Sequence, residues 1–407
     1  MSYDVAIVGG GIAGLYAAYR LAHESNKRVV LLERDSVLGG RAKTVPFKGA
    51  RVVTGAGIAR KHKDVRLLRL MHQLGVPLPP VYRVKHNRKL LGFPCAVKQT
   101  FQTVKTAYEA VASMPSLPAL TFKAFALQVL GGRAYSQFLQ CAGYTDFEND
   151  DVAHVLYNYG FEDNYENWDA VAVSWSALVQ ALAAAIKSRG GTIFQKCEVK
   201  SIVQVSAKTP QYALSTVSGV VHWATAIIIA TDIDGIRALL PALPLYKGIR
   251  GQPFLRLYVQ FSTQSAAAMS LRVLDGVTLV GGPLQKIIPI KKDAGIYMVA
   301  YCDNGNAVYM SRLMKNTSAN RRAVAHLVHA ALQIEYTQPL QITSMRAFYF
   351  KNGTHYYKPL MDPLKSRPEF LRAAQMPLPG VFVVGEVVSL HQGWVEGALE
   401  SVDAILN

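Results

Sequence analysis

The sequence predicts an α/β fold in which a Rossmann-like dinucleotide-binding domain is interleaved with a second, α+β domain. Three apolar runs predict it: one followed directly by a glycine cluster at the N-terminus, one ending in an acid, and one near the C-terminus ending in Gly385-Glu386. Short apolar runs that alternate with helical spacing are typical of a parallel sheet covered by helices. At 407 residues the chain is too long for one ordinary core, so we expect two domains.

The N-terminal glycine cluster has the spacing of a phosphate-binding loop. Gly9, Gly11 and Gly14 form G-x-G-x-x-G after the strand-like run 5–8, and residues 15–21 continue at helical spacing. The first glycine permits a tight turn, the second lets the backbone approach a pyrophosphate, and the third lets helix and strand pack closely. We interpret the cluster as a dinucleotide-binding βαβ unit rather than a purely structural turn.

An acid follows the second apolar run at the distance expected for a ribose ligand. Residues 29–32 lead into Glu33, which lies 19 residues after Gly14. A carboxylate there can accept hydrogen bonds from both ribose hydroxyls and would repel a 2′-phosphate. The sequence therefore favours FAD or NAD over NADP.

Two further glycine groups separate FAD from NAD. Gly39-Gly40-Arg41 follows the second strand, and Gly55-Ala56-Gly57 comes shortly after. The first group resembles the G-G-R signature of the flavin-dependent amine oxidase, monoamine oxidase-like superfamily, which is related to the phytoene desaturases. The resemblance implies that Arg41 contacts the flavin side of FAD and that residues 55–57 line the isoalloxazine ring.

The C-terminal motif of that family is also present. Residues 381–386 are similar to its closing strand and Gly-Glu pair, and residues 392–401 are similar to its G-[YW]-x-E-G-A helix. The resemblance implies that Glu386 binds the ribityl chain and that the helix N-terminus faces the O2 edge of the flavin. A positive helix end would stabilise negative charge on the reduced ring.

The middle of the chain matches the family in the same order. Residues 191–202 resemble the segment whose valine, here Val199, packs on adenine, and residues 226–231 resemble the strand that leads back to the cofactor. Two positions depart from the family pattern. The family often carries Glu-x-Arg after the second strand, whereas here Arg34 directly follows Glu33, and Thr54 stands where an acid often precedes the Gly-Ala pair. Neither change should abolish FAD binding.

The resemblance implies noncovalent FAD, since tyrosines replace the cysteine that some monoamine oxidases link to flavin. It implies the following residues around the cofactor: Gly9, Gly11, Ile12, Ala13, Gly14, Glu33, Arg34, Gly40, Arg41, Gly55, Ala56, Gly57, Ile58, Val199, Ala230, Thr231, Gly385, Glu386, Trp394 and Val395. The four cysteines show neither metal-ligand nor redox-pair spacing, so we expect no metal, no disulfide framework and a reducing, cytoplasmic compartment.

The resemblance also suggests catalytic residues. Monoamine oxidases hold the amine between two aromatic rings, and Trp394 falls on one ring position, with Tyr357 or Tyr356 as the second. Arg256 stands where family oxidases place an oxygen-handling lysine, with Lys286 as a minor alternative. Structural interpretations compete: Trp394 could instead cap the last helix, and Arg256 could lie on a solvent face.

Charge is distributed unevenly along the chain. Between Arg41 and Lys105 there are fifteen Lys or Arg against the single acid Asp64. This surplus suggests either a polyanionic partner, such as nucleic acid or an acidic protein, or a solvated surface. The segment 134–186 has no Lys or Arg, and its acids either steer a cationic amine or form a solvated face; they are Asp146, Glu148, Asp150, Asp151, Glu162, Asp163, Glu166 and Asp169.

The family layout predicts an FAD-binding domain from residues 1–79, 172–246 and 348–407, and a substrate domain from 80–171 and 247–347. We expect no membrane span, because no run supplies about 18 uninterrupted apolar residues.

Three functions stay open. The first is an FAD-dependent oxidase of an amine or polyamine that uses O2; the second is a flavin desaturase or isomerase acting on an apolar substrate; the third is a basic FAD-fold protein that binds nucleic acid or an assembly.

Overall fold

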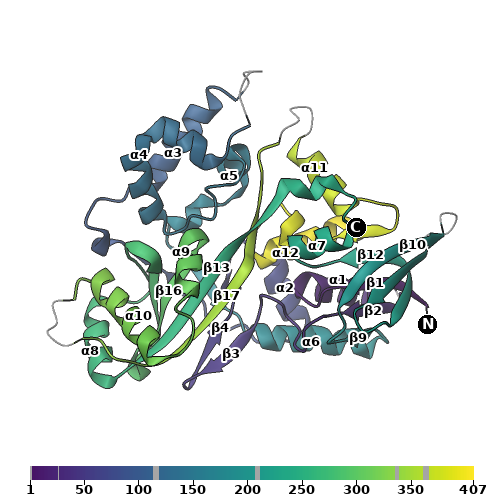
Figure 1. Ribbon diagram of the computed structural model, residues 1–407, viewed down its shortest axis with the longest axis horizontal. Helices are drawn as coiled ribbons and strands as arrows, with labels where there is room; N and C mark the ends of the chain where they lie inside the picture. Colours follow the sequence, from purple (N-terminus) through teal and green to yellow (C-terminus); the bar gives the residue numbers. More distant parts are fainter. Residues whose placement is uncertain (1, 26, 113–118, 207–210, 335–338, 361–365) are drawn as a thin grey trace.

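The chain forms two lobes joined by two long antiparallel strands, β13 (Ile249–Phe261) and β17 (Ile342–Tyr357) (Figure 1). The computed structural model describes residues 2–25, 27–112, 119–206, 211–334, 339–360 and 366–407. A strand rises about 3.3 Å per residue, so β13 and β17 extend about 40 Å or more. Ile249 and Tyr357 accordingly lie in the core of one lobe, and Phe261 and Ile342 in the core of the other.

One lobe is built on a mainly parallel sheet that contains the predicted βαβ unit. Its strand order is β10-β11-β12-β1-β2-β9, with β18 paired to β12. The strands are β1 (Ser2–Val8), β2 (Val29–Leu32), β9 (Thr192–Phe194), β10 (Val199–Ser206), β11 (Gln211–Thr216), β12 (Val221–Ile229) and β18 (Val381–Val383). β1 lies parallel between β12 and β2, and every residue of β2 is buried because both faces of the sheet are covered.

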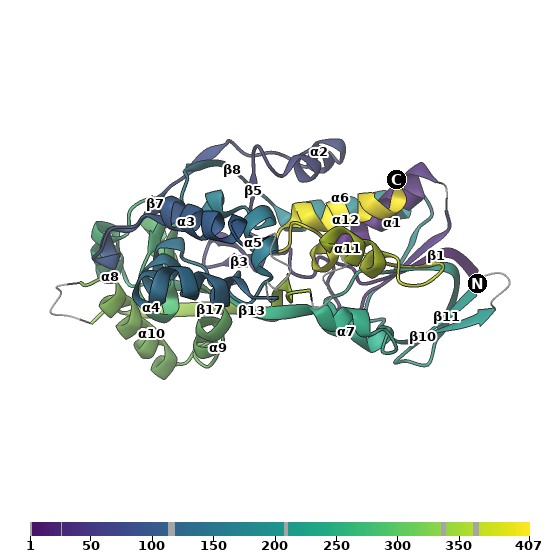
Figure 2. The same cartoon turned by 90° about the horizontal axis from the view of Figure 1, so that it is seen from above.

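Helices cover both faces of this sheet. One face packs against α1 (Ile12–Glu24), α2 (Val65–Gln73), α6 (Trp175–Ser188) and α12 (Val395–Leu406), of which α1, α6 and α12 lie together in Figure 2. The other face packs against α7 (Ile233–Leu239) and α11 (Arg367–Gln375). The first and last helices therefore share one core although the whole chain separates them.

The second lobe holds a sheet of order β17-β13-β16-β15-β14-β7. Its further strands are β7 (His86–Asn87), β14 (Val277–Leu279), β15 (Lys286–Lys291) and β16 (Ile296–Asp303). Helices α8 (Thr263–Arg272), α9 (Asn304–Ser311) and α10 (Ser318–Ala331) cover one face. The expected domain boundaries stay a prediction, because β13 and β17 run continuously through both lobes.

A helical layer tops the second lobe. It comprises α3 (Val97–Glu109), α4 (Phe122–Ala142) and α5 (Val152–Asn158), packed around a cluster of phenylalanines, and α4 changes direction at Gly131, whose φ is 74°.

Small strands complete the fold: β3 (Thr44–Phe47), β4 (Ala50–Val53), β5 (Ile58–Arg60), β6 (Tyr82–Val84) and β8 (Trp168–Ala172). Short 3-10 helices occupy Lys89–Leu91, Phe161–Asn164, Pro244–Gly248, Gly282–Leu284, Lys292–Ala294 and Glu386–Val388. Among the described residues, no helix is long and apolar enough to span a membrane.

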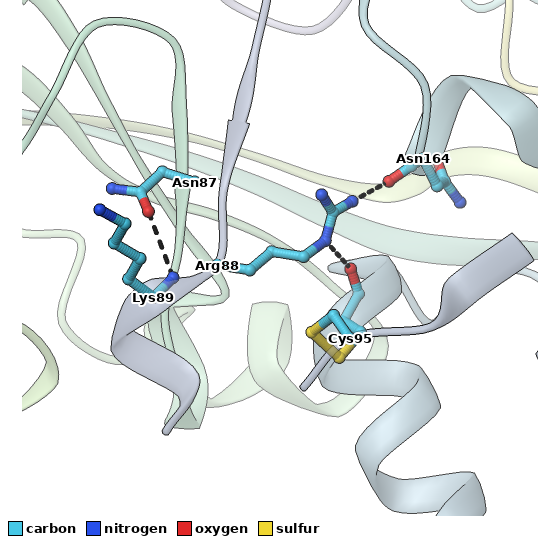
Figure 3. The surroundings of a disulfide bond; sticks show 6 residues. Asn87, Arg88, Lys89, Cys95 and Asn164 are labelled. Atoms are coloured by element: carbon cyan, nitrogen blue, oxygen red, sulfur yellow. Dashed lines mark hydrogen bonds between the residues drawn. A yellow bond between two sulfur atoms is a disulfide. The ribbon is translucent and has the colours of Figure 1, made fainter. Parts of the chain in front are cut away.

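A disulfide joins Cys95 to Cys141, 46 residues apart (Figure 3). Beside it, the Arg88 guanidinium donates to the carbonyls of Cys141 and Asn164, which ties the segment before α3 to the end of α4. The expectation of no disulfide was wrong, because sequence spacing does not reveal which chain segments the helical layer brings together. The argument from cysteine spacing for a reducing compartment falls with it.

Candidate active site

The glycine loop lies at the carboxyl end of β1, where α1 begins. A Cβ on Gly9 (φ 110°) would lie 2.5 Å from the Ala230 oxygen, and one on Gly14 would lie 2.0 Å from the Gly9 oxygen. A Cβ on Gly11 would meet no protein atom within 4 Å. The first and third glycines are thus needed for packing, whereas Gly11 keeps a space open. Since no side chain caps α1, its N-terminal N–H groups face this space, which fits a pyrophosphate.

Glu33 closes one side of the glycine loop. Its carboxylate accepts hydrogen bonds from the Gly10 N–H at 2.5 Å and the Asp35 N–H at 2.8 Å. The Cys197 N–H donates to the Glu33 carbonyl, which brings the start of β10, and with it Val199, beside the acid. Arg34 is exposed, and its contact with the cofactor stays a prediction.

Glu386 joins the C-terminal motif to the rest of the site. The buried carboxylate accepts hydrogen bonds from Arg41 Nη1 at 2.6 Å, from the Gly393 N–H at 3.0 Å and from His355 Nδ1. Arg41 also donates to the Gly353 carbonyl at 2.9 Å. Burial alone would raise the pKa of Glu386, but the neighbouring His355 and Arg41 hold its pKa well below the ordinary value, so the carboxylate stays ionised.

The loop of residues 55–57 is brought against Arg41 and Arg256. The Ala56 N–H donates to the Arg41 carbonyl at 3.0 Å, and Arg256 Nε donates to the Gly55 carbonyl at 2.9 Å. A Cβ on Gly57 would lie 3.0 Å from Arg256 Nη2. Arg256 is only 4% exposed, so its interpretation as a charge on a solvent face is wrong.

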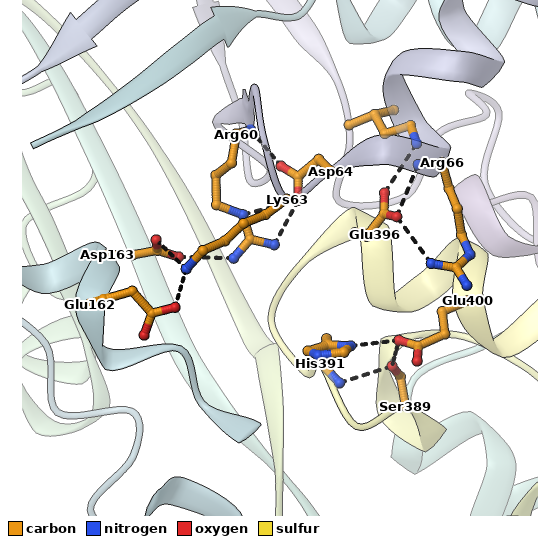
Figure 4. Close-up of polar contacts among 11 residues, drawn as sticks. Arg60, Lys63, Asp64, Arg66, Glu162, Asp163, Ser389, His391, Glu396 and Glu400 are labelled. Atoms are coloured by element: carbon orange, nitrogen blue, oxygen red, sulfur yellow. Dashed lines mark hydrogen bonds and ion pairs between the residues drawn. The ribbon is translucent and has the colours of Figure 1, made fainter. Parts of the chain in front are cut away.

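Trp394 occupies the N-cap position of α12, and its ring is half-buried. The Arg60 guanidinium lies 3.6 Å from the ring centroid, and Asp64 and Asp163 hold this guanidinium at 2.6 and 2.9 Å (Figure 4). One face of the ring is therefore covered by a cation of the chain itself. Sequence reasoning missed Arg60, because only the β5–β8 pairing places its strand beside the Asp163 turn.

The same helix end makes a second structural contact in Figure 4. Glu396, in the first turn of α12, accepts hydrogen bonds from the backbone N–H groups of Arg66 at 2.9 Å and Leu67 at 3.1 Å. A carboxylate in that position satisfies the free donors at the start of α2 and interacts favourably with the helix dipole. Glu396 thus anchors α2 to α12.

The structure gives the two candidate tyrosines other surroundings than expected. Tyr357 is 0% exposed, and its hydroxyl donates to the Ser389 carbonyl at 2.8 Å. The His154 ring packs against its edge, and the Arg367 guanidinium lies 4.6 Å from its centroid. This packing leaves Tyr357 no open face for a substrate. Tyr356 points to the opposite side of β17 and is half-buried, and among the described residues no ring contact joins either tyrosine to Trp394.

Lys286 and Arg256 both contact the ring of Tyr301. The Lys286 Nζ atom is buried without a hydrogen-bond partner, 2.7 Å from the Tyr144 ring centroid and 4.4 Å from that of Tyr301. The Arg256 guanidinium lies 4.0 Å from the centroid of the same Tyr301 ring. Burial lowers the pKa of Lys286 well below its ordinary value. No pattern in the sequence marks Tyr144 and Tyr301 as neighbours of this amine.

Some cations of the basic segment pair with acids of the acidic segment. Lys63 pairs with Glu162 and, at 2.7 Å, with Asp163, and Arg83 pairs with Asp169 at 3.0 Å. These acids are paired with cations of the chain itself, and the Glu162 side chain is 43% exposed, so steering of an amine and a solvated face both stay predictions. Pairing across distant segments cannot be read from local composition.

A comparison with known proteins decides the family: the sequence profile described as FAD dependent oxidoreductase matches residues 4–334. The chain belongs to this family. Its cofactor is accordingly FAD, and the open space at Gly11 together with the Glu33 and Glu386 carboxylates fits that cofactor.

Individual relatives resemble this chain to different extents. An uncharacterised protein of Acanthamoeba polyphaga mimivirus is 21% identical over 100% of this chain and 93% of its own length. Flavin-containing amine oxidase A of Equus caballus is 39% identical, but over only 22% of this chain and 16% of its own length. (S)-6-hydroxynicotine oxidase of Paenarthrobacter nicotinovorans is 41% identical over 24% of each chain. These local matches cover well under two thirds of the two oxidases.

A solved putrescine oxidase with redesigned cofactor binding has the same fold. The TM-score is 0.71 at 14% identity, and the alignment covers 100% of this chain and 98% of that one. The α/β Rossmann-like fold class predicted from the sequence is thereby confirmed.

Proposed function

We propose that the chain oxidises a primary amine to an imine, with O2 as the final electron acceptor. When bound, FAD supplies a hydride acceptor at N5. The observation that carries the proposal is the buried guanidinium of Arg256 beside the loop 55–57. Relatives named as an amine oxidase, a 6-hydroxynicotine oxidase and a putrescine oxidase support an amine donor.

Arg256 brings an uncompensated positive charge into the site. Its described partners include the Gly55 carbonyl, the Met298 sulfur at 3.5 Å and the rings of Tyr301 and Phe254, none of which is an acid. A fixed cation lowers the pKa of a nearby amine and so favours the neutral form, whose lone pair is needed to expel a hydride. The same charge stabilises negative charge that develops on the flavin side.

We assign the remaining roles from position. The glycine loop and the α1 N-terminus would hold the pyrophosphate, Glu33 the ribose, Val199, Ala230 and Thr231 the adenine side, and Arg41 with Glu386 the ribityl and flavin side. Trp394 would present the ring face that Arg60 leaves uncovered to the substrate. Asp64 and Asp163 neutralise Arg60, so its charge should not repel an approaching ammonium ion.

Anaerobic mixing of the holoprotein with amines tests the proposal. Putrescine, spermidine, tyramine and several amino acids are each added to the oxidised protein while flavin absorbance is followed. Bleaching by amines supports amine oxidation. If no amine bleaches the flavin at any pH, the proposal is wrong, and reduction by apolar substrates then has to be examined.

The prediction of a polyanionic partner is separate from this chemistry. Arg60, Lys63 and Arg83 of the basic segment are already paired with acids of the chain. Residues without such a pair in the described structure include Lys43, Lys48 and Arg51. Salt-sensitive retention of the protein on a heparin or DNA matrix would support this partner, and elution at low salt would contradict it.

A further inference from the structure

A small polar cavity is lined by residues of α5, β13, β17 and the segment before α12. Its volume is about 20 Å³, which is room for roughly one water-sized group. The residues that line it are Asp146, Asp150, His154, Asn158, Tyr159, Gln252, Thr354, His355, Leu390, Gln392 and Gly393. No Lys or Arg lines the cavity, whereas two carboxyl groups do.

Two glutamines that line this cavity have unpartnered side-chain oxygens. The Gln252 amide nitrogen donates to the Asp146 carbonyl at 2.7 Å and to Thr354 Oγ1 at 3.0 Å, which fixes the orientation of the amide. The Gln392 amide nitrogen donates to the Val387 carbonyl at 3.3 Å. Both Oε1 atoms are buried without a hydrogen-bond partner among the described residues, and Gln252 is only 3% exposed. Leaving a buried acceptor unpaired costs free energy, so we expect each oxygen to accept a hydrogen bond from a bound group.

His154 supplies a third acceptor. The residue is 4% exposed, and its Nδ1 is buried without a partner while Nε2 faces Asp150 at 3.9 Å. Burial, aided by the charge of Arg367, lowers the pKa of His154 to about 3, so the ring is neutral. A neutral ring with its proton on Nε2 offers a lone pair at Nδ1.

We propose that this cavity binds one terminal ammonium group of a diamine substrate; the proposal rests on the proposed amine oxidation. A primary ammonium carries three N–H donors, which matches the three unpartnered acceptors on Gln252, Gln392 and His154. Asp146 and Asp150 also line the cavity; burial raises the pKa of both carboxyl groups, and a bound ammonium group would favour their ionised forms. The other end of the diamine is then the neutral amine that is oxidised.

The size and the chemistry of the cavity discriminate among ligands. A water molecule has only two donors and carries no charge, so it leaves one acceptor unpaired. A guanidinium or quaternary ammonium group is larger than one water-sized space. His355 also ties the cavity to the cofactor side, because it lines the cavity and contacts Glu386.

Calorimetric titration of the holoprotein with putrescine and with n-butylamine tests the site, because the two amines differ in the second ammonium group. We expect putrescine to bind at least about tenfold more tightly. Gln252→Leu should abolish the preference by raising KM for putrescine at least about tenfold more than it raises KM for n-butylamine. Gln260→Leu, a half-buried glutamine on the same strand, is the matched control and should keep the preference.

The other possible results also support or overturn the proposed ammonium site. Equal affinity for the two amines in the unchanged protein, or a preference that survives Gln252→Leu, overturns the proposal. If Gln252→Leu does not fold, Gln252→Glu replaces it and should increase the preference, because it adds a carboxylate. Displacement of putrescine by KCl at equal concentration, dependent on Gln252, would show a metal-cation site instead and would also overturn it.

The titration separates this inference from the proposed function. A preference for putrescine without any flavin bleaching would leave the ammonium site standing and contradict amine oxidation. Flavin bleaching at equal concentrations by both amines, with equal affinities, would support amine oxidation and remove the site.

Discussion

Arg41 Nη1 lies 2.6 Å from Glu386 Oε1, although 345 residues separate the two side chains in the sequence. This contact joins the G-G-R group to the C-terminal Gly-Glu pair, and through Gly393 it also fixes the approach to α12. Charge-assisted hydrogen bonds of this kind are short and about twice as strong as neutral ones. The two ends of the chain therefore build one half of the cofactor site together.

Replacing Glu386 should weaken both cofactor binding and the fold. Glu386→Gln keeps the shape but loses the charge, so we expect FAD affinity to fall at least about tenfold. The pKa of Glu386 is lowered in the folded state, so its contribution to stability is present above the unfolded pKa and is lost as pH falls. Urea unfolding should show a large stability gap between the two proteins near about pH 7 and a smaller one near about pH 4. A difference in stability that does not change with pH would contradict an ionised Glu386 in the folded state.

The glycine loop predicts two different kinds of failure. Gly11 has φ −73° and open space at its Cβ position, so Gly11→Val should fold but purify without FAD. Gly14→Val should not fold, because its Cβ would lie 2.0 Å from the Gly9 oxygen. Circular dichroism and flavin absorbance distinguish the two results, with Gly305→Val as a control in a helix with open space. A yellow Gly11→Val protein would refute the loop assignment.

Trp394 should matter for the substrate more than for the cofactor. We expect Trp394→Ala to retain FAD but to lower amine-driven flavin reduction at least about tenfold, since the ring orients the amine. Stopped-flow absorbance measures this rate. Trp223→Ala, an exposed tryptophan on β12, is the control and should leave the rate unchanged. Equal rates in both variants would remove Trp394 from the substrate site.

Arg256 tests how the protein handles oxygen. A lysine has a compact ammonium group, whereas the arginine is held in place by the Gly55 carbonyl and the Tyr301 ring. Arg256→Lys should therefore accelerate reoxidation of the reduced protein by O2 about tenfold, measured by stopped-flow mixing. Arg346→Lys on the neighbouring strand β17 serves as the control. A slower or unchanged reoxidation would show that this position does not limit the reaction with oxygen.

Asp146 predicts an unusual dependence of stability on pH. Burial, and then the nearby Asp303, raise its pKa from 3.8 to about 7. Between these values the folded state binds more protons than the unfolded state, so this group makes stability fall as pH rises. Asp146→Asn should gain at least about 1.4 kcal/mol relative to the unchanged protein between about pH 4 and about pH 7. Asp293→Asn, an exposed acid, should gain nothing, and equal pH profiles for all three proteins would contradict the raised pKa.

The cofactor half of the site was predictable because its signals are local. Gly9, Gly11 and Gly14 follow a strand directly, and the second strand was found at its observed bounds, Val29–Leu32. Gly39-Gly40-Arg41 and Gly385-Glu386 are short motifs whose residue types reflect backbone geometry and charge. Even so, only the folded chain shows that Arg41 and Glu386 touch.

The substrate half was not predictable, because its contacts depend on register and on packing between lobes. Along β17, alternation places His355 and Tyr357 on the same side, yet only packing decides that His355 reaches Glu386 while Tyr357 is enclosed by His154 and Arg367. Asp163, one of the two acid partners of Arg60, likewise comes from a turn about a hundred residues away in sequence. The Cys95–Cys141 disulfide also depends on packing that brings distant segments together, so it could not be predicted from the sequence.

The central claim is that the FAD of this chain accepts electrons from an amine. A single-turnover mixture of the oxidised holoprotein with excess putrescine, kept free of oxygen, tests it most directly. The account predicts complete loss of the oxidised flavin absorbance and one aldehyde formed per flavin after hydrolysis of the imine. Flavin that stays oxidised, with no aldehyde released, would contradict it.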